Sequence, residues 1–194
     1  MPLKEVIENL DLVDYADRLN LSTGRYLALV IGNQEYDNWT DLETPLNDVD
    51  KVSRVLESSY NFEVTKLENS SRREILQAIY SFGEKAEFND HVLVYYAGHG
   101  IVDEISNEGY WIPSNADKTF RPDWVSNSEI KSALATINSR HLLVMADSCY
   151  SGTIIRSGGA INENISNSLM ERLFSKKAKV AITSGGNEPV ADST

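Results

Sequence analysis

Strongly apolar runs that alternate with amphipathic segments constrain the fold of this chain more than any other feature. The apolar runs are RYLALVIGN (25–33), DHVLVYYAGHG (90–100), RHLLVMADSC (140–149) and KVAITSGG (179–186), and the run FEVTKLE (62–68) alternates as a strand near an edge does. Three segments between them have helical spacing: PLNDVDKVSRVLES (45–58), SRREILQAIYSFGEKA (71–86) and SNSEIKSALATIN (126–138). This alternation predicts an α/β fold with a mostly parallel sheet and helices on both faces.

The remaining segments divide the chain into two parts. Residues 3–19 have the spacing of an amphipathic helix, and Ser22, Thr23 and Gly24 break that pattern. We therefore expect an N-terminal helix or linker over residues 1–24 and one domain over residues 25–194. Within the domain, residues 109–117 are predicted to be a short extended excursion, and residues 150–168, rich in Gly, Ser and Asn, a mobile loop.

Composition excludes several classes of function. The formal charge is 18 − 29 = −11, which disfavours binding to the phosphate backbone of nucleic acids. No apolar run approaches the roughly 18 residues of a membrane-spanning helix, and the N-terminus has no apolar signal core. The single cysteine excludes an intrachain disulfide, so we expect a reducing, cytoplasmic location.

That single cysteine, Cys149, follows a predicted buried strand, and His99 follows another. In an open parallel sheet, ligands bind beyond the carboxyl ends of the strands. If the two strands are neighbours, the thiol and the imidazole face each other, and an imidazole that accepts the thiol proton makes a nucleophile. Taken alone, a cysteine is more often a small buried apolar residue. His91 and His141 stand at strand starts, where we expect structural roles.

Glycines next to His99 add to this hypothesis. Gly98 and Gly100 allow the backbone to approach a substrate closely, and the N–H group of Gly100 is a candidate donor to a developing oxyanion. Other motifs are missing from the sequence: AGHGIVD lacks the third glycine of a dinucleotide site, and there is no Walker A sequence, zinc-ligand spacing or G-x-S-x-G elbow. We therefore predict no metal site and no cofactor for the chemistry.

The segments LALVIGNQEY, PLNDVDKVSRVL, LVYYAGHG, LLVMADSCYSG and AITSGGNE, in this order, resemble the caspase-like cysteine peptidases. The sequence is most similar to metacaspases, paracaspases and their bacterial relatives, from Arg25 to Asp192. The resemblance implies a caspase-like three-layer sandwich. It also implies that His99 acts as base and general acid, Cys149 as the acylated nucleophile, and the N–H groups of Gly100 and Cys149 as the oxyanion hole.

The resemblance also implies a specificity. Metacaspases and paracaspases line the first specificity pocket with acids and cut after Arg or Lys, and the matching positions here are Asp147, Asp48 and Glu188. Each acid has an ordinary alternative: Asp147 caps a loop, Asp48 stabilises a helix N-terminus, and Glu188 is a solvated loop residue. A buried guanidinium needs carboxylate partners, so we expect cleavage after Arg or Lys and rejection of Asp.

Residues 150–177 match the processing loop of caspases. Arg156 is the candidate for self-cleavage, and the SKK sequence at 175–177 is a competing site. Relatives continue after EPVAD with another strand and helix, which the domain over 25–194 is expected to lack.

Some metacaspases need calcium. Asp37, Asp41, Asp103 and Glu104 do not have the spacing of a calcium loop, and a calcium requirement stays open. The expected partners are a peptide or protein substrate with a basic residue before the cut bond and an activating protein or fused domain. The alternative function is a catalytically silent caspase-like scaffold or sensor, and a flavodoxin-like binding domain is a more distant one.

Overall fold

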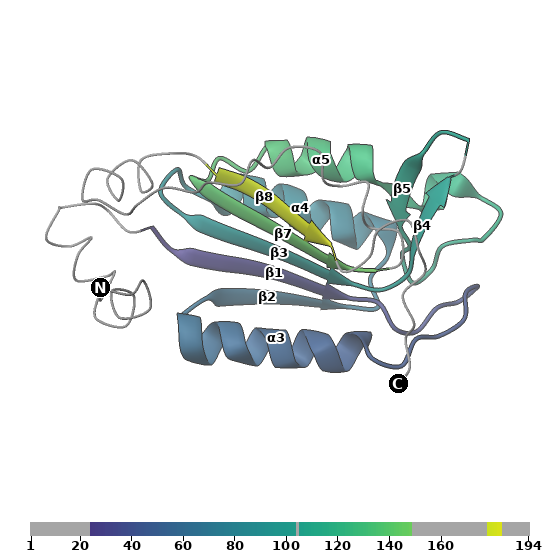
Figure 1. The fold of residues 1–194 in the computed structure, drawn as a ribbon, viewed down its shortest axis with the longest axis horizontal. Helices are drawn as coiled ribbons and strands as arrows, with labels where there is room; N and C mark the ends of the chain where they lie inside the picture. Colours follow the sequence, from purple (N-terminus) through teal and green to yellow (C-terminus); the bar gives the residue numbers. More distant parts are fainter. Residues whose placement is uncertain (1–23, 104, 149–177, 184–194) are drawn as a thin grey trace, which may run out of the picture.

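The computed structural model describes residues 24–103, 105–148 and 178–183, and its main feature is a five-stranded parallel sheet. The strands lie in the order β2-β1-β3-β7-β8 (Figure 1). Their bounds are β1 Tyr26–Gly32, β2 Glu63–Glu68, β3 His91–Ala97, β7 His141–Asp147 and β8 Ala178–Thr183. The predicted parallel sheet is confirmed, and β2 lies at an edge as its alternation indicated. The helix predicted over 3–19 and the loop over 150–168 lie outside the described residues.

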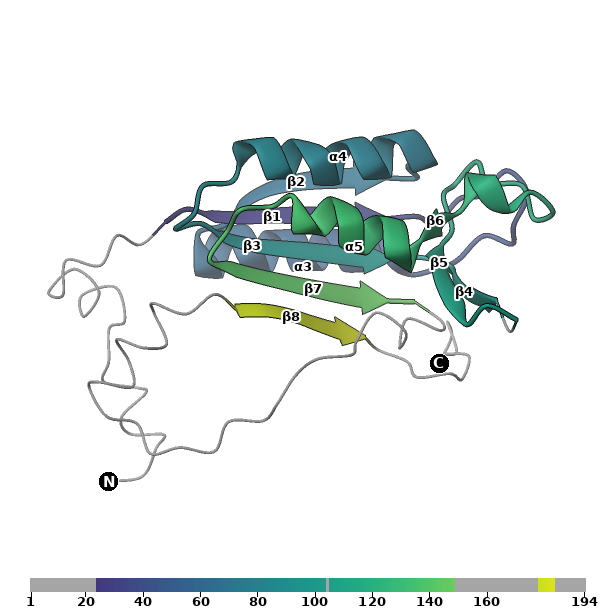
Figure 2. The same ribbon diagram turned by 90° about the horizontal axis from the view of Figure 1, so that it is seen from above.

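Helices cover both faces of this sheet (Figures 1 and 2). Helix α3 (Pro45–Tyr60) packs on one face, and helices α4 (Arg72–Lys85) and α5 (Asn127–Ala135) lie together on the other. Ser71, the predicted cap, begins α4 with a capping box in which its hydroxyl accepts from the N–H of Glu74. The predicted three-layer α/β sandwich is therefore confirmed.

The central strands are buried on both faces. Along β1, Leu27, Leu29 and Ile31 pack with the α4 side of the core, and Ala28 and Val30 pack with the α3 side. Each fully buried Leu, Ile or Val side chain stabilises the fold by roughly 1.5–3 kcal/mol relative to an exposed one. Burial on both faces explains why the sequence of this strand is continuously apolar.

The other edge strand, β8, is less covered. Val180 and Ile182 align with Leu143 and Met145 of β7 and remain 53% and 49% exposed. Helix α3 packs against β1, β2 and β3, so it covers the half of its sheet face that lies away from β8.

A second, smaller sheet lies beyond the carboxyl ends of the parallel strands (Figure 1). It is antiparallel, in the order β4 (Gly100–Asp103), β5 (Glu108–Trp111) and β6 (Val125–Ser126), and a short 3-10 helix (Arg121–Asp123) precedes β6. The prediction of one strand over 90–100 was therefore too long. The chain leaves the parallel sheet after Ala97, because Gly98 adopts a φ of +158° and redirects the backbone into β4.

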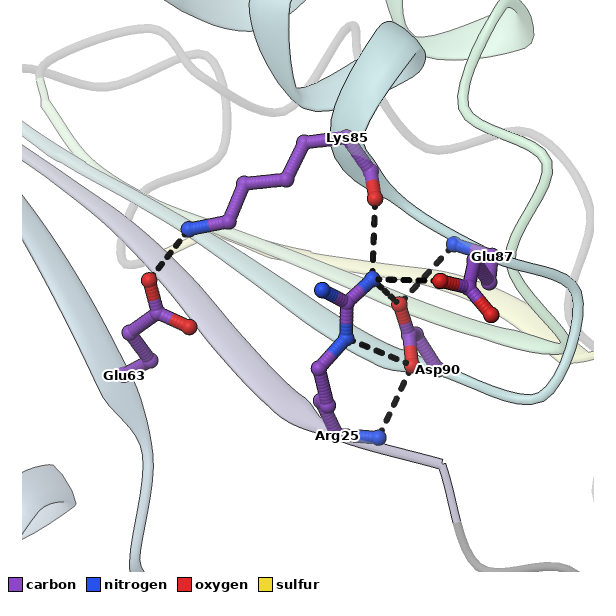
Figure 3. A network of polar contacts seen from close by, with 5 residues as sticks. All are labelled: Arg25, Glu63, Lys85, Glu87 and Asp90. Atoms are coloured by element: carbon purple, nitrogen blue, oxygen red, sulfur yellow. Dashed lines mark hydrogen bonds and ion pairs between the residues drawn. The ribbon is translucent and has the colours of Figure 1, made fainter.

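At the other end of the parallel sheet, where the strands begin, polar side chains connect β1 to the segment between α4 and β3 (Figure 3). The buried carboxylate of Asp90 accepts hydrogen bonds from the backbone N–H and guanidinium of Arg25 and from the backbone N–H of Glu87. The guanidinium of Arg25 also donates to the carbonyl of Lys85, whose ammonium pairs with Glu63 on β2. These contacts fix the register in which β1, β2 and β3 begin.

His91 and His141 also lie at this end of the sheet, as the first residues of β3 and β7, where the sequence analysis predicted them. Their Nδ1 atoms are 2.9 Å apart, and the ring of His91 stacks on Tyr26 at a centroid distance of 4.5 Å. Burial lowers the pKa of His91, and the neighbouring His141 and Arg140 lower it further. Both histidines lie at the amino-terminal ends of β3 and β7, and Ala97 and Asp147 lie at the carboxyl ends of the same strands.

Candidate active site

The strands that precede His99 and Cys149 are neighbours. β3 and β7 pair in parallel, and Ala97 aligns with Asp147. His99 and Cys149 each follow this aligned pair by two residues, so the adjacency required by the sequence hypothesis is confirmed for the strands. Cys149 itself lies outside the described residues, and the structure therefore describes the histidine half of the predicted dyad.

The imidazole of His99 contacts a backbone carbonyl. Its Nε2 lies 2.7 Å from the carbonyl oxygen of Thr40. Because a carbonyl oxygen only accepts, the ring donates from Nε2, and in the neutral ring Nδ1 carries the lone pair. That arrangement suits a base that must receive a proton at Nδ1. No third partner for His99 was predicted from the sequence, and the contact with Thr40 was therefore missed.

Two aromatic side chains restrain the ring of His99. The Tyr36 ring lies 4.8 Å from it at 49°, and the Trp39 ring lies 5.8 Å from it at 41°. The indole N–H of Trp39 donates to the carbonyl of Ala116 at 3.0 Å, which fixes this side chain against the segment before β6. A signal for these residues was present, since QEYDNWT follows the first predicted strand directly and must lie at the same sheet edge.

The predicted oxyanion donor, Gly100, is the first residue of β4, an edge strand of the small sheet. The N–H of Ile112 donates to the carbonyl of His99 at 3.0 Å, which makes Gly100 and Trp111 a non-hydrogen-bonded pair of the ladder. In such a pair the backbone groups point away from the partner strand. The N–H of Gly100 is therefore not used by β5.

Gly98 has a different environment from the one expected. A Cβ atom at this position would lie 2.8 Å from the Tyr96 hydroxyl oxygen and 2.9 Å from that of Tyr36. The backbone of Gly98 thus approaches two phenols of this chain, and these contacts account for a glycine at this position. The contact between Tyr36 and Gly98 was not predicted, because the two residues are 62 positions apart in the sequence.

Two of the three predicted pocket acids lie near one tyrosine. Asp48 stands in the first turn of α3, Asp147 ends β7, and Tyr95 is on β3 between these elements, on the face that α3 covers. Burial raises the pKa of Tyr95 to about 12, and the charges of Asp147 and Asp48 contribute to the rise. Both carboxylates are therefore within electrostatic reach of the same phenol.

The other predicted site residues, Glu188 and the self-cleavage candidate Arg156, lie outside the described residues, as does the rest of the loop over 150–177. Among the described residues, no group of three or more His, Cys, Asp or Glu side chains is arranged to hold a metal ion. Two acids considered for calcium have other contacts: Asp41 accepts from the N–H of Tyr36, and Asp103 pairs with Arg121. No helix in the described part of the chain is long and apolar enough to cross a bilayer.

Comparison with known proteins gives a consistent result. The family model described as the caspase domain matches residues 25–190. The human mucosa-associated lymphoid tissue lymphoma translocation protein 1 is 30% identical over 97 residues, which are 50% of this chain and 11% of the human protein.

Among solved structures, protein GSU0716 from Geobacter sulfurreducens is similar with a TM-score of 0.55 and 23% identity, over 67% of this chain and 52% of that one, which supports the fold. The chain thus spans about a tenth of the human relative and about half of the bacterial chain. The match over residues 25–190 covers most of the chain, which therefore belongs to the caspase domain family, a family of cysteine peptidases.

Proposed function

We propose that this chain is a cysteine endopeptidase that cleaves after Arg or Lys with His99 and Cys149. The observation that carries the proposal is the parallel pairing of β3 with β7, in which Ala97 aligns with Asp147. His99 follows Ala97, and Cys149 follows Asp147, by two residues in the sequence. The contact between His99 Nε2 and the Thr40 carbonyl supports the role of His99 as base. The membership of the chain in the caspase domain family supports the reaction class.

In the proposed reaction, the Cys149 thiol gives its proton to Nδ1 of His99, and the sulfur attacks the carbonyl carbon of the substrate. The oxygen that becomes negative accepts hydrogen bonds from the N–H groups of Gly100 and Cys149. His99 then returns the proton to the leaving amine, the C–N bond breaks, and a thioester to Cys149 remains. A water molecule, deprotonated by His99, hydrolyses the thioester and restores the thiol.

The preference for a basic residue rests on the acids at the same edge. The charges of Asp48 and Asp147 both act on Tyr95, whose pKa burial raises first, and Glu188 is the third proposed acid. Two carboxylates pair with a guanidinium more favourably than with an ammonium, because the planar fork of Arg matches carboxylate geometry. The same charges repel an Asp side chain, so the proposed pocket discriminates in both directions.

We also propose that the loop after Cys149 is processed. Arg156, in IIRSGG, is a basic residue followed by small residues, which suits an enzyme of this specificity. Mass spectrometry of the active protein beside the Cys149→Ala variant tests this. New termini after Arg156 in the active protein alone support processing there; termini after Lys176 or Lys177 assign it to the SKK sequence, and an intact loop in both proteins rejects it.

Turnover of fluorogenic peptides with Arg, Lys or Asp before the reporter tests the function. The expected result is turnover of Arg and Lys peptides, no turnover by Cys149→Ala or His99→Ala, and a fall in kcat/KM of about 100-fold for Asp147→Asn, equivalent to ~2.8 kcal/mol. Glu57→Gln is the control for the loss of one carboxylate outside the proposed pocket, since Glu57 is exposed on α3. Preferential turnover of Asp peptides, or activity without Cys149, rejects the proposal and leaves a scaffold or another chemistry.

A further inference from the structure

The backbone of His99 is held from both sides by tyrosine hydroxyl groups. The N–H of His99 donates to the hydroxyl oxygen of Tyr36 at 2.9 Å, and the hydroxyl of Tyr96 donates to the carbonyl of His99 at 2.9 Å. The carbonyl oxygen of Ile112, at 3.3 Å, is a second and more distant acceptor for the Tyr96 hydroxyl. Tyr36 comes from the segment after β1, and Tyr96 comes from β3 itself. The two peptide groups that flank this residue therefore each have a fixed partner.

Both tyrosines are themselves anchored. The hydroxyl of Tyr36 donates to the carbonyl of Asn33 at 2.9 Å, and Asn33 is fully buried at the end of β1. The ring of Tyr96 is fully buried and stacks on Trp111 of β5, with centroids 4.2 Å apart and an interplanar angle of 2°. Burial and the neighbouring Tyr36 raise the pKa of Tyr96 well above its usual value, so its hydroxyl keeps its proton.

Gly98 gives independent evidence that this arrangement is specific. The hydroxyl oxygens of Tyr96 and Tyr36 would lie 2.8 and 2.9 Å from a Cβ atom at Gly98, which is too close for an ordinary contact, and the φ of +158° favours glycine. The closeness of the phenols to the backbone thus depends on the residue immediately before His99.

The contacts with the His99 carbonyl have a consequence for Gly100. The carbonyl of His99 and the N–H of Gly100 belong to one peptide group, and in a planar trans peptide they point in opposite directions. The hydroxyl of Tyr96 and the N–H of Ile112 both donate to that carbonyl, at 2.9 and 3.0 Å. Together they set the direction of the Gly100 N–H, which is free of β5 by the register of the ladder.

We propose that Tyr96 and Tyr36 are positioning residues with separate tasks, an inference that rests on the proposed peptidase function. Tyr96 aims the Gly100 N–H at the oxyanion through the carbonyl of His99. Tyr36 sets the direction of the imidazole, because its hydroxyl holds the His99 N–H and its ring lies 4.8 Å from the imidazole. Neither tyrosine touches the substrate.

The separate tasks predict different signatures for two conservative variants. Tyr96→Phe lowers kcat for an Arg peptide about tenfold with KM unchanged, and it weakens the binding of an arginine aldehyde, whose adduct carries an oxyanion, by a similar factor. It leaves the alkylation rate of Cys149 unchanged, because alkylation forms no oxyanion. Tyr36→Phe lowers both kcat and the alkylation rate. Tyr80→Phe, which removes the hydroxyl of a tyrosine that is 47% exposed on α4, is the control and changes neither kcat nor the alkylation rate.

Two results overturn the proposal. The first is that Tyr96→Phe has the kcat and the aldehyde affinity of the wild type, and that Tyr36→Phe has the kcat and the alkylation rate of the wild type. The other is a fall in all readouts that parallels a loss of folded protein by circular dichroism, which indicates a merely structural role. If the wild-type protein turns over no Arg peptide, the proposed function fails separately. The hydrogen bond to Tyr36 is then judged by amide exchange of His99, which must be faster in Tyr36→Phe than in the wild type.

Discussion

Replacing Asp90 with alanine tests how the start of the parallel sheet is held together. The Asp90 side chain is 3% exposed and accepts from the backbone N–H groups of Arg25 and Glu87, each at 2.8 Å, and from the Arg25 guanidinium at 2.7 Å (Figure 3). The variant removes the acceptor for all three donors. It therefore loosens the attachment of β1 to the segment that leads into β3.

The magnitude follows from those contacts. A hydrogen bond to a charged acceptor contributes roughly 1.5 kcal/mol or somewhat more, so the two backbone donors account for about 3 kcal/mol. The guanidinium adds little, because nearly half of the Arg25 side chain is exposed and the ion pair is screened by solvent. For a domain of this size, about 3 kcal/mol corresponds to a fall in Tm of about 6–12 °C.

The acidity of Asp90 adds a pH dependence. Burial alone raises its pKa, but the hydrogen bonds from Arg25 and Glu87 overcome that effect and hold the pKa of Asp90 below its usual 3.8. Ionised Asp90 therefore stabilises the fold above pH 3.8, and this contribution is lost as the pH falls through the lowered pKa. The difference between wild type and Asp90→Ala is expected to be constant near neutrality and to narrow in acid.

Urea unfolding, followed by tryptophan fluorescence, measures the effect. Glu87→Ala is the matched control: its carboxylate is 82% exposed and lies 3.5 Å from the same guanidinium, and its backbone N–H is retained. We expect this control to change the free energy of unfolding by less than about 0.5 kcal/mol. Equal losses in the two variants, or a loss below about 1 kcal/mol in Asp90→Ala, would refute the reasoning.

Two further variants test other contacts. The pKa of His91 lies below its usual 6.5, so neutral His91 contributes its full stability above that pH and the free energy of unfolding declines as the pH falls below it. His141→Gln removes one cause of the lowered pKa. The fall in Tm between about pH 7.5 and pH 5 should therefore be shallower in this variant. An unchanged slope contradicts the importance of the histidine contact. Gly98→Ala places a Cβ atom against the hydroxyls of Tyr36 and Tyr96, and we expect a lower Tm with lost peptide turnover; wild-type values for both would show that the backbone moves freely there.

The parallel sheet and its helices were predictable because their signals are local. The strands β1 and β3 are buried on both faces and read as continuous apolar runs, and Ser71 marks the start of α4. The placement of His99 beside the strand that leads to Cys149 followed from a general rule on parallel sheets and from the resemblance. The small sheet was only partly predicted, since its strands of two to four residues carry too little pattern.

The surroundings of His99 were not predictable, because they depend on contacts between distant parts of the chain. Thr40 precedes His99 by 59 residues, and its side chain is irrelevant to the contact, since only its carbonyl takes part. The contacts of Tyr36 depend on the path of the segment after β1, which no periodicity describes. A backbone acceptor of this kind leaves no mark in a sequence, and only coordinates identify it.

The alkylation rate of the single cysteine tests most directly whether His99 acts on Cys149. With iodoacetamide at pH 7, we predict that the wild-type thiol reacts at least about tenfold faster than the thiol of folded His99→Ala, because a nearby imidazole maintains the thiolate. His141→Gln, at the opposite end of the sheet, should react at the wild-type rate. Equal rates in the wild type and His99→Ala would show that the imidazole and the thiol do not meet, and would contradict the account.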